Sequence, residues 1–315
     1  MAPPFRNNTH HCNCSYASTA ASSNASQPSL LVFSGGPAVG DIRSRCLRLS
    51  DQSTTEALAV RTLLGHRLPL DAQKAKFEWY DIVEGNHSLW DGVSKPYRET
   101  IRAFLAYFQD QILRRSDELF CFSNGSIGNF FFAGARIFFQ SLDAAIFLFS
   151  RVSQIPTESL VLPVISTNDR LTLGCELWDG TIIRGQNEIS HPTNGSMEPI
   201  NKVFPPANPT VLDQLKSVDC IIFAMGSLFT SICPSLVLLG IGEIVSSRSC
   251  PKPSQYVNTI FVPKDGQIPL DIDSLAAQGI FDVVTVDSLQ DSTAGILFDP
   301  KSLIQSLANL LRGNA

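Results

Sequence analysis

The sequence has little charge. Charged residues make up 17% of its 315 residues, against roughly 25% in an average soluble protein. The chain carries 24 Lys and Arg and 29 Asp and Glu, for a net charge of −5, so it lacks the basic surface that duplex DNA or RNA requires. Because 44% of its residues are apolar, the chain can bury a large core, and disorder over its whole length is excluded.

Cysteine and recognisable catalytic motifs are also sparse. The 8 cysteines are too few for a disulfide-dense secreted scaffold, and most lie in apolar runs, so we expect reduced core residues in a reducing compartment. His66, His87 and His191 have no Cys or His partner at ligand spacing, which predicts surface or core positions for them. No Gly-x-Ser-x-Gly segment is present that would expose a serine nucleophile.

The start of the chain predicts a disordered tail or a transit segment over residues 1–28. Residues 1–29 contain one charged residue, Arg6, and the first acid of the chain is Asp41. No continuous apolar stretch occurs there, which argues against a secretory signal. The Ser-rich, acid-free composition resembles an organelle transit peptide, and a plain disordered tail is the alternative. The chain is accordingly expected in the cytoplasm or the plastid stroma.

Two apolar runs are long enough to be considered as membrane-spanning helices. Residues 220–242 form a stretch of 23 without a charge, long enough to cross a bilayer, but small and polar residues interrupt it. Residues 129–150 contain Arg136 and Asp143, whose charges are costly in lipid. We therefore expect a protein without a membrane partner.

Strands and helices alternate along the rest of the chain. Buried apolar runs predict strands at 29–33, 160–165, 219–223, 257–262 and 281–286. Helical spacing predicts helices over 41–65, 95–115, 129–150 (two helices broken near 140–143), 209–217, about 228–246, 272–278 and 300–311. Asp179-Gly180 predicts a hairpin between 171–178 and 181–189. Together these elements predict a single α/β domain over 29–315, with a three-layer, mostly parallel sheet and a small β-hairpin appendage.

Three Gly- and Ser-rich turns are candidates for phosphate binding, because helix N-termini beyond strand ends present free N–H groups to anions. The candidate residues are Gly40, Asp41 and Arg43 in the first turn, Asn124, Gly125, Gly128 and Asn129 in the second, and Gly226, Ser227 and Thr230 in the third. Each turn also fits an ordinary connector whose polar groups satisfy only the local backbone.

An aromatic and acidic stretch has two interpretations. Trp79, Trp90 and Tyr97 are interleaved with acidic residues and His87. A loop that contacts a ring-shaped ligand is one interpretation. Ordinary packing of the aromatic side chains is the other, and we favour it.

The turns, in this order, resemble the CofD/YvcK-like family, which groups the 2-phospho-L-lactate transferases of deazaflavin-coenzyme synthesis with the bacterial gluconeogenesis factors. The resemblance covers most of residues 40–242 and is carried by four phrases: Gly40 to Arg43, Ser123 to Asn129, Leu162 to Val164 with the hairpin Leu177 to Thr181, and Met225 to Pro234. It implies a Rossmann-like fold, a possible homodimer, and a nucleotide-diphosphate ligand: a guanosine-linked phospholactate in the transferases and a UDP-sugar in the factors.

The chain departs from the family pattern at three points. Gly36 is followed at once by Pro37, so a helix, a strand and an Asp-Asp-Gly-Gly phrase of the family are missing. Similar breaks lie between Lys202 and Val203 and after Lys252. The chain is thus expected to be a plant-type member with internal deletions, whose domain is incomplete relative to the family.

Two functions remain open. In a CofD-like transferase, an acceptor hydroxyl displaces a nucleoside monophosphate from a nucleotide diphosphate, while the turns and Mg²⁺ stabilise negative charge. The resemblance implies the Mg²⁺, with Asp41 as a helix cap or metal ligand and Arg43 neutralising charge. The alternative is a non-catalytic YvcK-like regulator of gluconeogenesis that binds a UDP-sugar through the same turns, so enzymatic activity is left open and no catalytic base is assigned. A third interpretation is a shortened form that neither binds nor folds stably.

Overall fold

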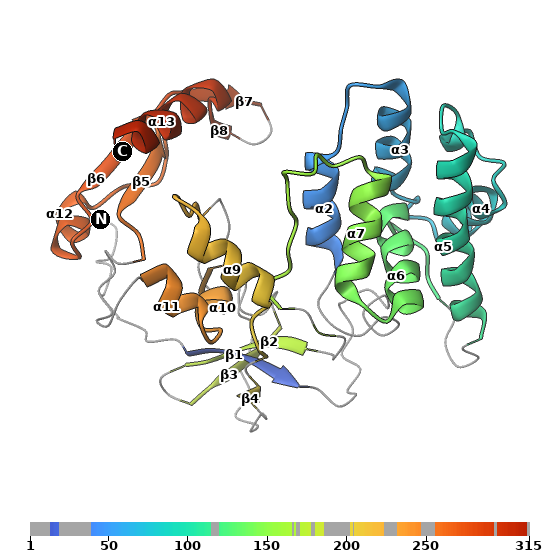
Figure 1. The fold of residues 1–315 in the computed structure, drawn as a ribbon, viewed down its shortest axis with the longest axis horizontal. Helices are drawn as coiled ribbons and strands as arrows, with labels where there is room; N and C mark the ends of the chain where they lie inside the picture. Colours follow the sequence, from blue (N-terminus) through green and yellow to red (C-terminus); the bar gives the residue numbers. More distant parts are fainter. Residues whose placement is uncertain are drawn as a thin grey trace, which may run out of the picture. The chain divides into compact units, whose positions relative to one another are not determined.

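The computed structural model describes residues 13–18, 39–114, 120–165, 167, 171–177, 180–185, 202–203, 205–223, 232–246, 256–292 and 295–313. The chain divides into two compact units, 1–211 and 212–315, whose elements are labelled in Figure 1. None of the described helices is both long and apolar enough to cross a membrane. The single domain expected over 29–315 stays a prediction.

The described part of the first unit is mainly helical. Its helices are α2 (Val39–Leu49), α3 (Thr55–Gly65), α4 (Ala72–Glu84), the 3-10 turn η1 (Ser88–Trp90), α5 (Lys95–Leu113), α6 (Ile127–Phe139) and α7 (Leu142–Val152). The long helix expected from Lys95 and the helix pair broken near Gln140 are confirmed. The region 41–65 forms two helices, because Thr54 caps the start of α3 by accepting a hydrogen bond from the N–H of Ala57 at 3.1 Å.

Aromatic side chains fill the core between these helices. Trp79 on α4 stacks on Phe122 with ring centroids 5.0 Å apart, and Phe108 stacks on Phe130 at 5.3 Å. Trp79 and Trp90 are 0% and 1% exposed. The packing interpretation of the two tryptophans is therefore confirmed, and Trp79 lies on a helix where a loop was considered.

A four-stranded antiparallel sheet also belongs to the first unit. Its strands are β1 (Asn13–Ser18), β2 (Leu171–Glu176), β3 (Ile182–Arg184) and β4 (Lys202–Val203), in the order β3-β2-β1-β4. The expected hairpin is confirmed: β2 pairs with β3, and Gly180 has the positive φ of +84° that the turn requires. The hairpin is joined by β1, from the range in which a tail was expected.

The cysteines do not all follow the expectation of reduced core residues. Cys46, Cys121, Cys220 and Cys233 are free, and Cys46 is buried while Cys121 is exposed. Cys175 on β2 is disulfide-bonded, which corrects the expectation for this residue. An apolar neighbourhood does not reveal whether another sulfur lies opposite on the next strand.

The second unit contains a short parallel pair of strands. After α9 (Pro209–Ser217), which runs across the unit boundary, come α10 (Cys233–Leu236), α11 (Ile241–Ser246), β5 (Thr259–Pro263), α12 (Ile272–Ala277), β6 (Asp282–Val286), β7 (Ser288–Asp291), β8 (Gly295–Phe298) and α13 (Pro300–Gly313). β5 and β6 pair in parallel and α12 lies between them in sequence. These strands, α9, α12 and α13 confirm the elements expected in their ranges.

Two expected strands are wrong. Residues 160–165 and 219–223 form no strand, and Ile222 is 61% exposed. A parallel strand is stable only between neighbours that cover it, and an apolar run does not show whether such neighbours exist. The helix expected up to residue 246 is divided into α10 and α11 by Gly240 with φ +89°.

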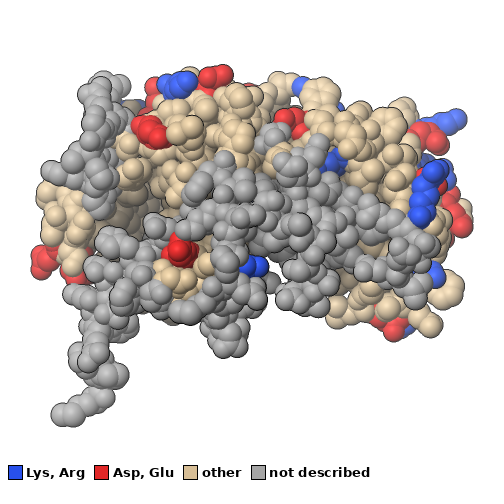
Figure 2. All heavy atoms as spheres, turned by 90° about the horizontal axis from the view of Figure 1, so that it is seen from below, with Lys and Arg blue, Asp and Glu red and all other residues tan. Residues whose placement is uncertain are grey.

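The fold is thus mixed α/β, with many helices and small sheets. The mostly parallel three-layer sheet is not confirmed by the described residues, and the strand expected at 29–33 lies outside them. On the face seen in Figure 2, described side chains of both charge signs are scattered among uncharged ones.

Candidate anion-binding site

The starts of α2 and α6 lie against each other. A Cβ placed on Gly40, in the first turn of α2, would lie 4.0 Å from Nδ2 of Asn129, in the first turn of α6. A Cβ placed on Gly128 would lie 2.9 Å from Cδ of Arg43. The fold therefore brings residues of the first and second predicted turns together, although they are far apart in the sequence.

The position of the third predicted turn is outside the part of the chain that the structure describes. Gly226, Ser227 and Thr230 lie outside the described residues, as does the first turn before Val39. That the third turn converges with the other two on one ligand stays a prediction.

Four backbone amides of the second turn and the start of α6 are already hydrogen-bonded within the protein. Four N–H groups donate to carbonyl oxygens of nearby residues in the same chain at 2.9 to 3.0 Å: those of Asn124, Gly125, Ile127 and Asn129. An N–H that is bonded in this way does not face a ligand. These four amides are therefore not available to a phosphate, and the phosphate-binding role of the other groups of this turn stays a prediction.

Close packing accounts for the two glycines of the second turn. A Cβ on Gly125 would overlap the ring of Phe130, and one on Gly128 would overlap the carbonyl oxygen of Leu64. Both positions therefore need glycine for close approach within the protein. The sequence pattern could not separate this reason from close approach to a ligand.

An extended segment after α3 holds the second turn in place. The N–H of Leu68 donates to the carbonyl of Gly125 at 2.8 Å, and the N–H of Asn124 donates to the carbonyl of Pro69 at 2.9 Å. Arg67 pairs with Ser126 as an isolated antiparallel bridge. The pairing fixes Arg67 beside the turn that carries Asn124 and Asn129.

Arg67 is a site residue that the sequence did not indicate. Its Nη1 donates a hydrogen bond to the carbonyl of Asn124 at 3.1 Å. The pKa of Arg43 is lowered by burial and then by the charge of Arg67, while Asp41 acts in the opposite direction. The charge of Arg67 thus acts on Arg43, in the first turns of α2. No local motif surrounds Arg67, and only its tertiary neighbours reveal it.

Two buried polar atoms at this place have no hydrogen-bond partner among the described residues: Nε of Arg43 and Oδ1 of Asn129. An unsatisfied buried polar group costs about 1–3 kcal/mol. The first N–H groups of α2 also lack an acceptor within the helix. We call the group Arg43, Arg67, Asn124 and Asn129 the arginine corner. The positive charge, Nε of Arg43 and the first N–H groups of α2 suit an anion, whereas Oδ1 of Asn129 is an acceptor and needs a donor.

Asp41 is compatible with the predicted Mg²⁺ as a single ligand. It lies exposed in the first turn of α2, next to the arginine corner. No group of three or more His, Cys, Asp or Glu able to hold a metal occurs within the described ranges. Mg²⁺ commonly takes one or two carboxylates together with substrate phosphates and water, so Asp41 fits a metal that arrives with its phosphate ligand.

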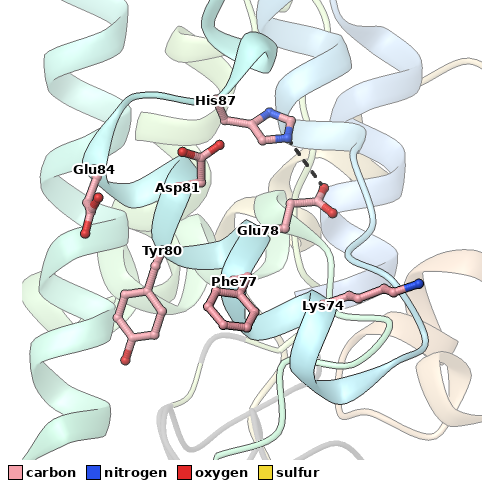
Figure 3. Close-up of a pocket in the computed structure, with 7 residues that line it drawn as sticks. All are labelled: Lys74, Phe77, Glu78, Tyr80, Asp81, Glu84 and His87. Carbon is pink, nitrogen blue, oxygen red and sulfur yellow. Dashed lines mark ion pairs between the residues drawn. The ribbon is translucent and has the colours of Figure 1, made fainter.

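A second polar cluster lies on α4. Nε2 of His66 hydrogen-bonds Oε1 of Glu78, and Nε2 of His87 lies 3.9 Å from the same oxygen, as the dashed line in Figure 3 marks. Nδ1 of His87 accepts the N–H of Leu89 at 3.1 Å, so the neutral ring carries its proton on Nε2 and directs it to Glu78. Both imidazoles, predicted to be isolated, share one carboxylate.

This cluster borders an open cavity of about 670 Å³. The cavity is lined by Lys74, Phe77, Glu78, Tyr80, Asp81, Glu84 and His87.

The cluster also anchors the arginine corner. His66 directly precedes Arg67, and the carbonyl of His66 accepts the N–H of Ile127 at 3.0 Å. The bond between His66 and Glu78 therefore fixes the segment that presents Arg67.

Comparison with known proteins identifies the family. The family model described as 2-phospho-L-lactate transferase CofD matches residues 7–267, most of the chain. The chain belongs to the CofD family.

Relatives of this CofD-family chain include proteins of fungi and bacteria. The uncharacterized protein YNL011C of Saccharomyces cerevisiae is 29% identical over 306 residues, which covers 73% of this chain and 68% of the yeast protein. A putative gluconeogenesis factor of Clostridium acetobutylicum is 32% identical over 142 residues, 44% of this chain and 30% of that protein. The gluconeogenesis factor of Listeria monocytogenes is 35% identical over 92 residues, 28% and 27% of the two chains. The CofD-family chain thus spans less than a third of each bacterial factor.

A solved structure also resembles the chain. A UPF0052-family protein of Bacillus halodurans has a TM-score of 0.49 and 18% sequence identity, and the match covers 66% of this chain and 81% of that one.

In the alignment with the yeast protein, about a quarter of the 306 aligned positions have no residue in this CofD-family chain, since 73% of 315 residues is roughly 230 residues. That these gaps are deletions in this chain stays a prediction.

Proposed function

We propose that this CofD-family chain binds the diphosphate of a nucleotide-linked organic compound at the arginine corner and transfers the phospho-organic group to an acceptor hydroxyl. The observation that carries the proposal is that two arginines from different elements lie against the second turn: Arg43 packs on Gly128, and Arg67 pairs with Ser126 and donates to the carbonyl of Asn124. Two like charges held near each other repel, and an anion placed against both removes that repulsion. Guanidinium groups also match phosphate oxygens in geometry.

The residues of the corner have separate tasks in this proposal. Arg43 and Arg67 neutralise phosphate charge, and the first N–H groups of α2 add further hydrogen-bond donors with partial positive charge. Nδ2 of Asn129 lies in the first turn of α6, facing Gly40, where it can donate to a phosphate oxygen. A Mg²⁺ bound to Asp41 and to the phosphates would neutralise further charge when present.

The proposed reaction is a displacement at phosphorus. The acceptor oxygen bonds to the phosphorus that carries the organic group, and the bond from that phosphorus to the bridging oxygen breaks. The nucleoside monophosphate leaves with the bridging oxygen, and the acceptor releases its proton to water. Charge stabilisation at the phosphates accounts for catalysis in such a reaction, because positioning and neutralisation dominate phosphoryl transfer.

A regulator that binds a UDP-sugar without turnover is the second candidate. The names of the bacterial relatives, which are gluconeogenesis factors, favour it. The arginine corner would serve such a protein equally well, because binding the diphosphate needs the same charges. The difference between the two functions lies in product formation alone.

The proposal includes the finer features that the resemblance implies. We infer a Rossmann-like arrangement, of which the parallel pair β5 and β6 with α12 is a fragment. A homodimer located in the cytoplasm or the plastid stroma completes the proposal. Light scattering after size-exclusion chromatography measures the oligomeric state.

The deciding experiment combines calorimetry with product analysis. The protein is titrated with UDP-glucose and, separately, incubated with guanosine-linked phospholactate, a deazaflavin acceptor and Mg²⁺. Release of GMP supports the transferase, and saturable heat with UDP-glucose but no product supports the regulator. Arg43→Gln is expected to weaken either response, while Arg48→Gln, an exposed residue at the other end of α2, serves as the matched control. A protein that melts cooperatively but shows neither heat nor product overturns both functions, and one without a cooperative melt supports the unstable shortened form.

A further inference from the structure

We propose that Arg67 makes the arginine corner selective for two adjacent phosphates over a single phosphate. The inference rests on the proposed function, because it concerns the same site. It assigns a specificity role to a residue that lies outside all three Gly- and Ser-rich turns.

The first cation of the corner is fixed by packing. The Cγ and Cδ atoms of Arg43 lie against Gly128, at 3.1 and 2.9 Å from the position of a Cβ on that residue. Its Nε is buried without a partner among the described residues. Arg43 therefore presents its guanidinium from one place, at the contact between α2 and α6.

The second cation reaches the corner from another element. Arg67 sits on the extended segment after α3, where its backbone pairs with Ser126 and its Nη1 donates to the carbonyl of Asn124 at 3.1 Å. A guanidinium has five N–H donors, and the side chain of Arg67 is exposed. Its remaining donors are thus available to a ligand that already contacts Arg43.

Among the described residues, the charged side chains of the corner and its neighbour Asp41 are two cations and one acid. Asp41 acts on Arg43 as an opposite charge, and Arg67 acts on Arg43 as a like charge. One phosphate bound at Arg43 satisfies the packed cation. Arg67 contacts the same turn at Ser126 and Asn124, so a second phosphate on the same ligand can bind to it, and we infer that Arg67 adds affinity mainly for diphosphates.

This selectivity has a use in either proposed function. In a transferase, the substrate carries two adjacent phosphates and the nucleotide product carries one, so the product binds more weakly and leaves readily. In a regulator, the same clamp separates a UDP-sugar from UMP. The selectivity is therefore measurable without knowing the organic group.

The test uses inorganic pyrophosphate and inorganic phosphate as probes, titrated calorimetrically in the absence of metal. Wild-type protein is expected to prefer pyrophosphate. In Arg67→Gln the Kd for pyrophosphate should rise about tenfold or more, as expected for a lost charge-assisted hydrogen bond, while the Kd for phosphate changes less than about twofold. Arg67→Lys, which keeps the charge without the fork of donors, should be intermediate. Arg114→Gln on α5, an exposed arginine paired with Asp110, is the matched control.

The outcomes separate the inference from the proposed function. A wild-type protein that binds neither probe overturns both. The inference alone is overturned if the wild-type protein binds pyrophosphate and Arg67→Gln either raises the Kd of both probes by the same factor or leaves both Kd values unchanged. If Arg67→Gln does not melt cooperatively, Arg67→Lys decides: an unchanged ratio of the two Kd values rejects the role of Arg67.

Discussion

Replacing Gly128 with alanine tests whether this glycine serves packing within the protein. Alanine favours a helix interior over glycine by about 1 kcal/mol. Against this gain, the added Cβ would overlap the carbonyl oxygen of Leu64 and would lie 2.9 Å from Cδ of Arg43. The arginine side chain can rotate away, but the carbonyl belongs to the backbone of α3, and Leu64 itself is 0% exposed. The overlap is therefore relieved only if α3 and α6 move apart.

The expected magnitude follows from these two opposing effects. Overpacking a dense interior costs about 1–3 kcal/mol. Gly128 is the second residue of α6, where fewer helical hydrogen bonds form and the gain from alanine is smaller than in the interior. We expect the free energy of unfolding to fall by about 1–2 kcal/mol.

Urea unfolding followed by tryptophan fluorescence measures the effect, because Trp79 and Trp90 are buried in the core of the first unit. Gly40→Ala is the matched control, since its Cβ would meet Asn129 only at an ordinary 4.0 Å, and its free energy of unfolding should be unchanged or higher. A Gly128→Ala protein as stable as Gly40→Ala would refute the packing explanation.

Three further predictions concern the first unit and use the same unfolding assay. Burial raises the pKa of Cys46 from 9.0 to about 11, so its stabilising contribution is present below pH 9 and is lost as pH rises through 11. The loss between pH 8 and pH 10 should be about 1.3 kcal/mol, and Cys46→Ala should flatten that part of the curve; equal slopes would contradict this. Glu78→Gln removes the charged acceptor of His66 and should lower the free energy of unfolding by about 1–2 kcal/mol at pH 7. Glu99 is exposed, and a loss no larger than that of Glu99→Gln would count against this prediction. Asp71→Ala removes the cap that accepts the N–H of Lys74 at 2.8 Å and should cost about 1 kcal/mol, whereas Asp71→Asn should restore most of it; equal losses in the two variants would reject the capping explanation.

The sequence predicted helices well where apolar residues recur at helical spacing. The long helix α5 has Ile101, Leu105, Phe108 and Ile112 buried on one face, as expected. α4 was not predicted, although Ala75, Trp79, Ile82 and Val83 are buried at the same spacing, because packing of the aromatic side chains was expected there without a helix. The cap at Asp71 was the signal that could have shown it.

Strands and site residues were harder to predict, because both depend on partners elsewhere in the chain. Residues 219–223, apolar after Asp219, form no strand, since an apolar run carries no information about a neighbour with which to pair. Gly40, Arg43, Gly128 and Asn129 were expected to act together, and the fold brings them together; whether they bind phosphate stays a prediction. Arg67 gave no local signal.

The pairing between the segment after α3 and the second turn has a consequence for the order of folding. Arg67 and Asn124 are 57 positions apart, and closing a flexible loop of that length costs about 3–4 kcal/mol in chain entropy. Contacts so distant in sequence form late. During synthesis on the ribosome, a growing chain that has reached α5 carries Arg67 without its carbonyl acceptor. The phosphate affinity proposed for the arginine corner would then be acquired only once α6 has emerged and docked, so phosphate binding would report the docking of α6.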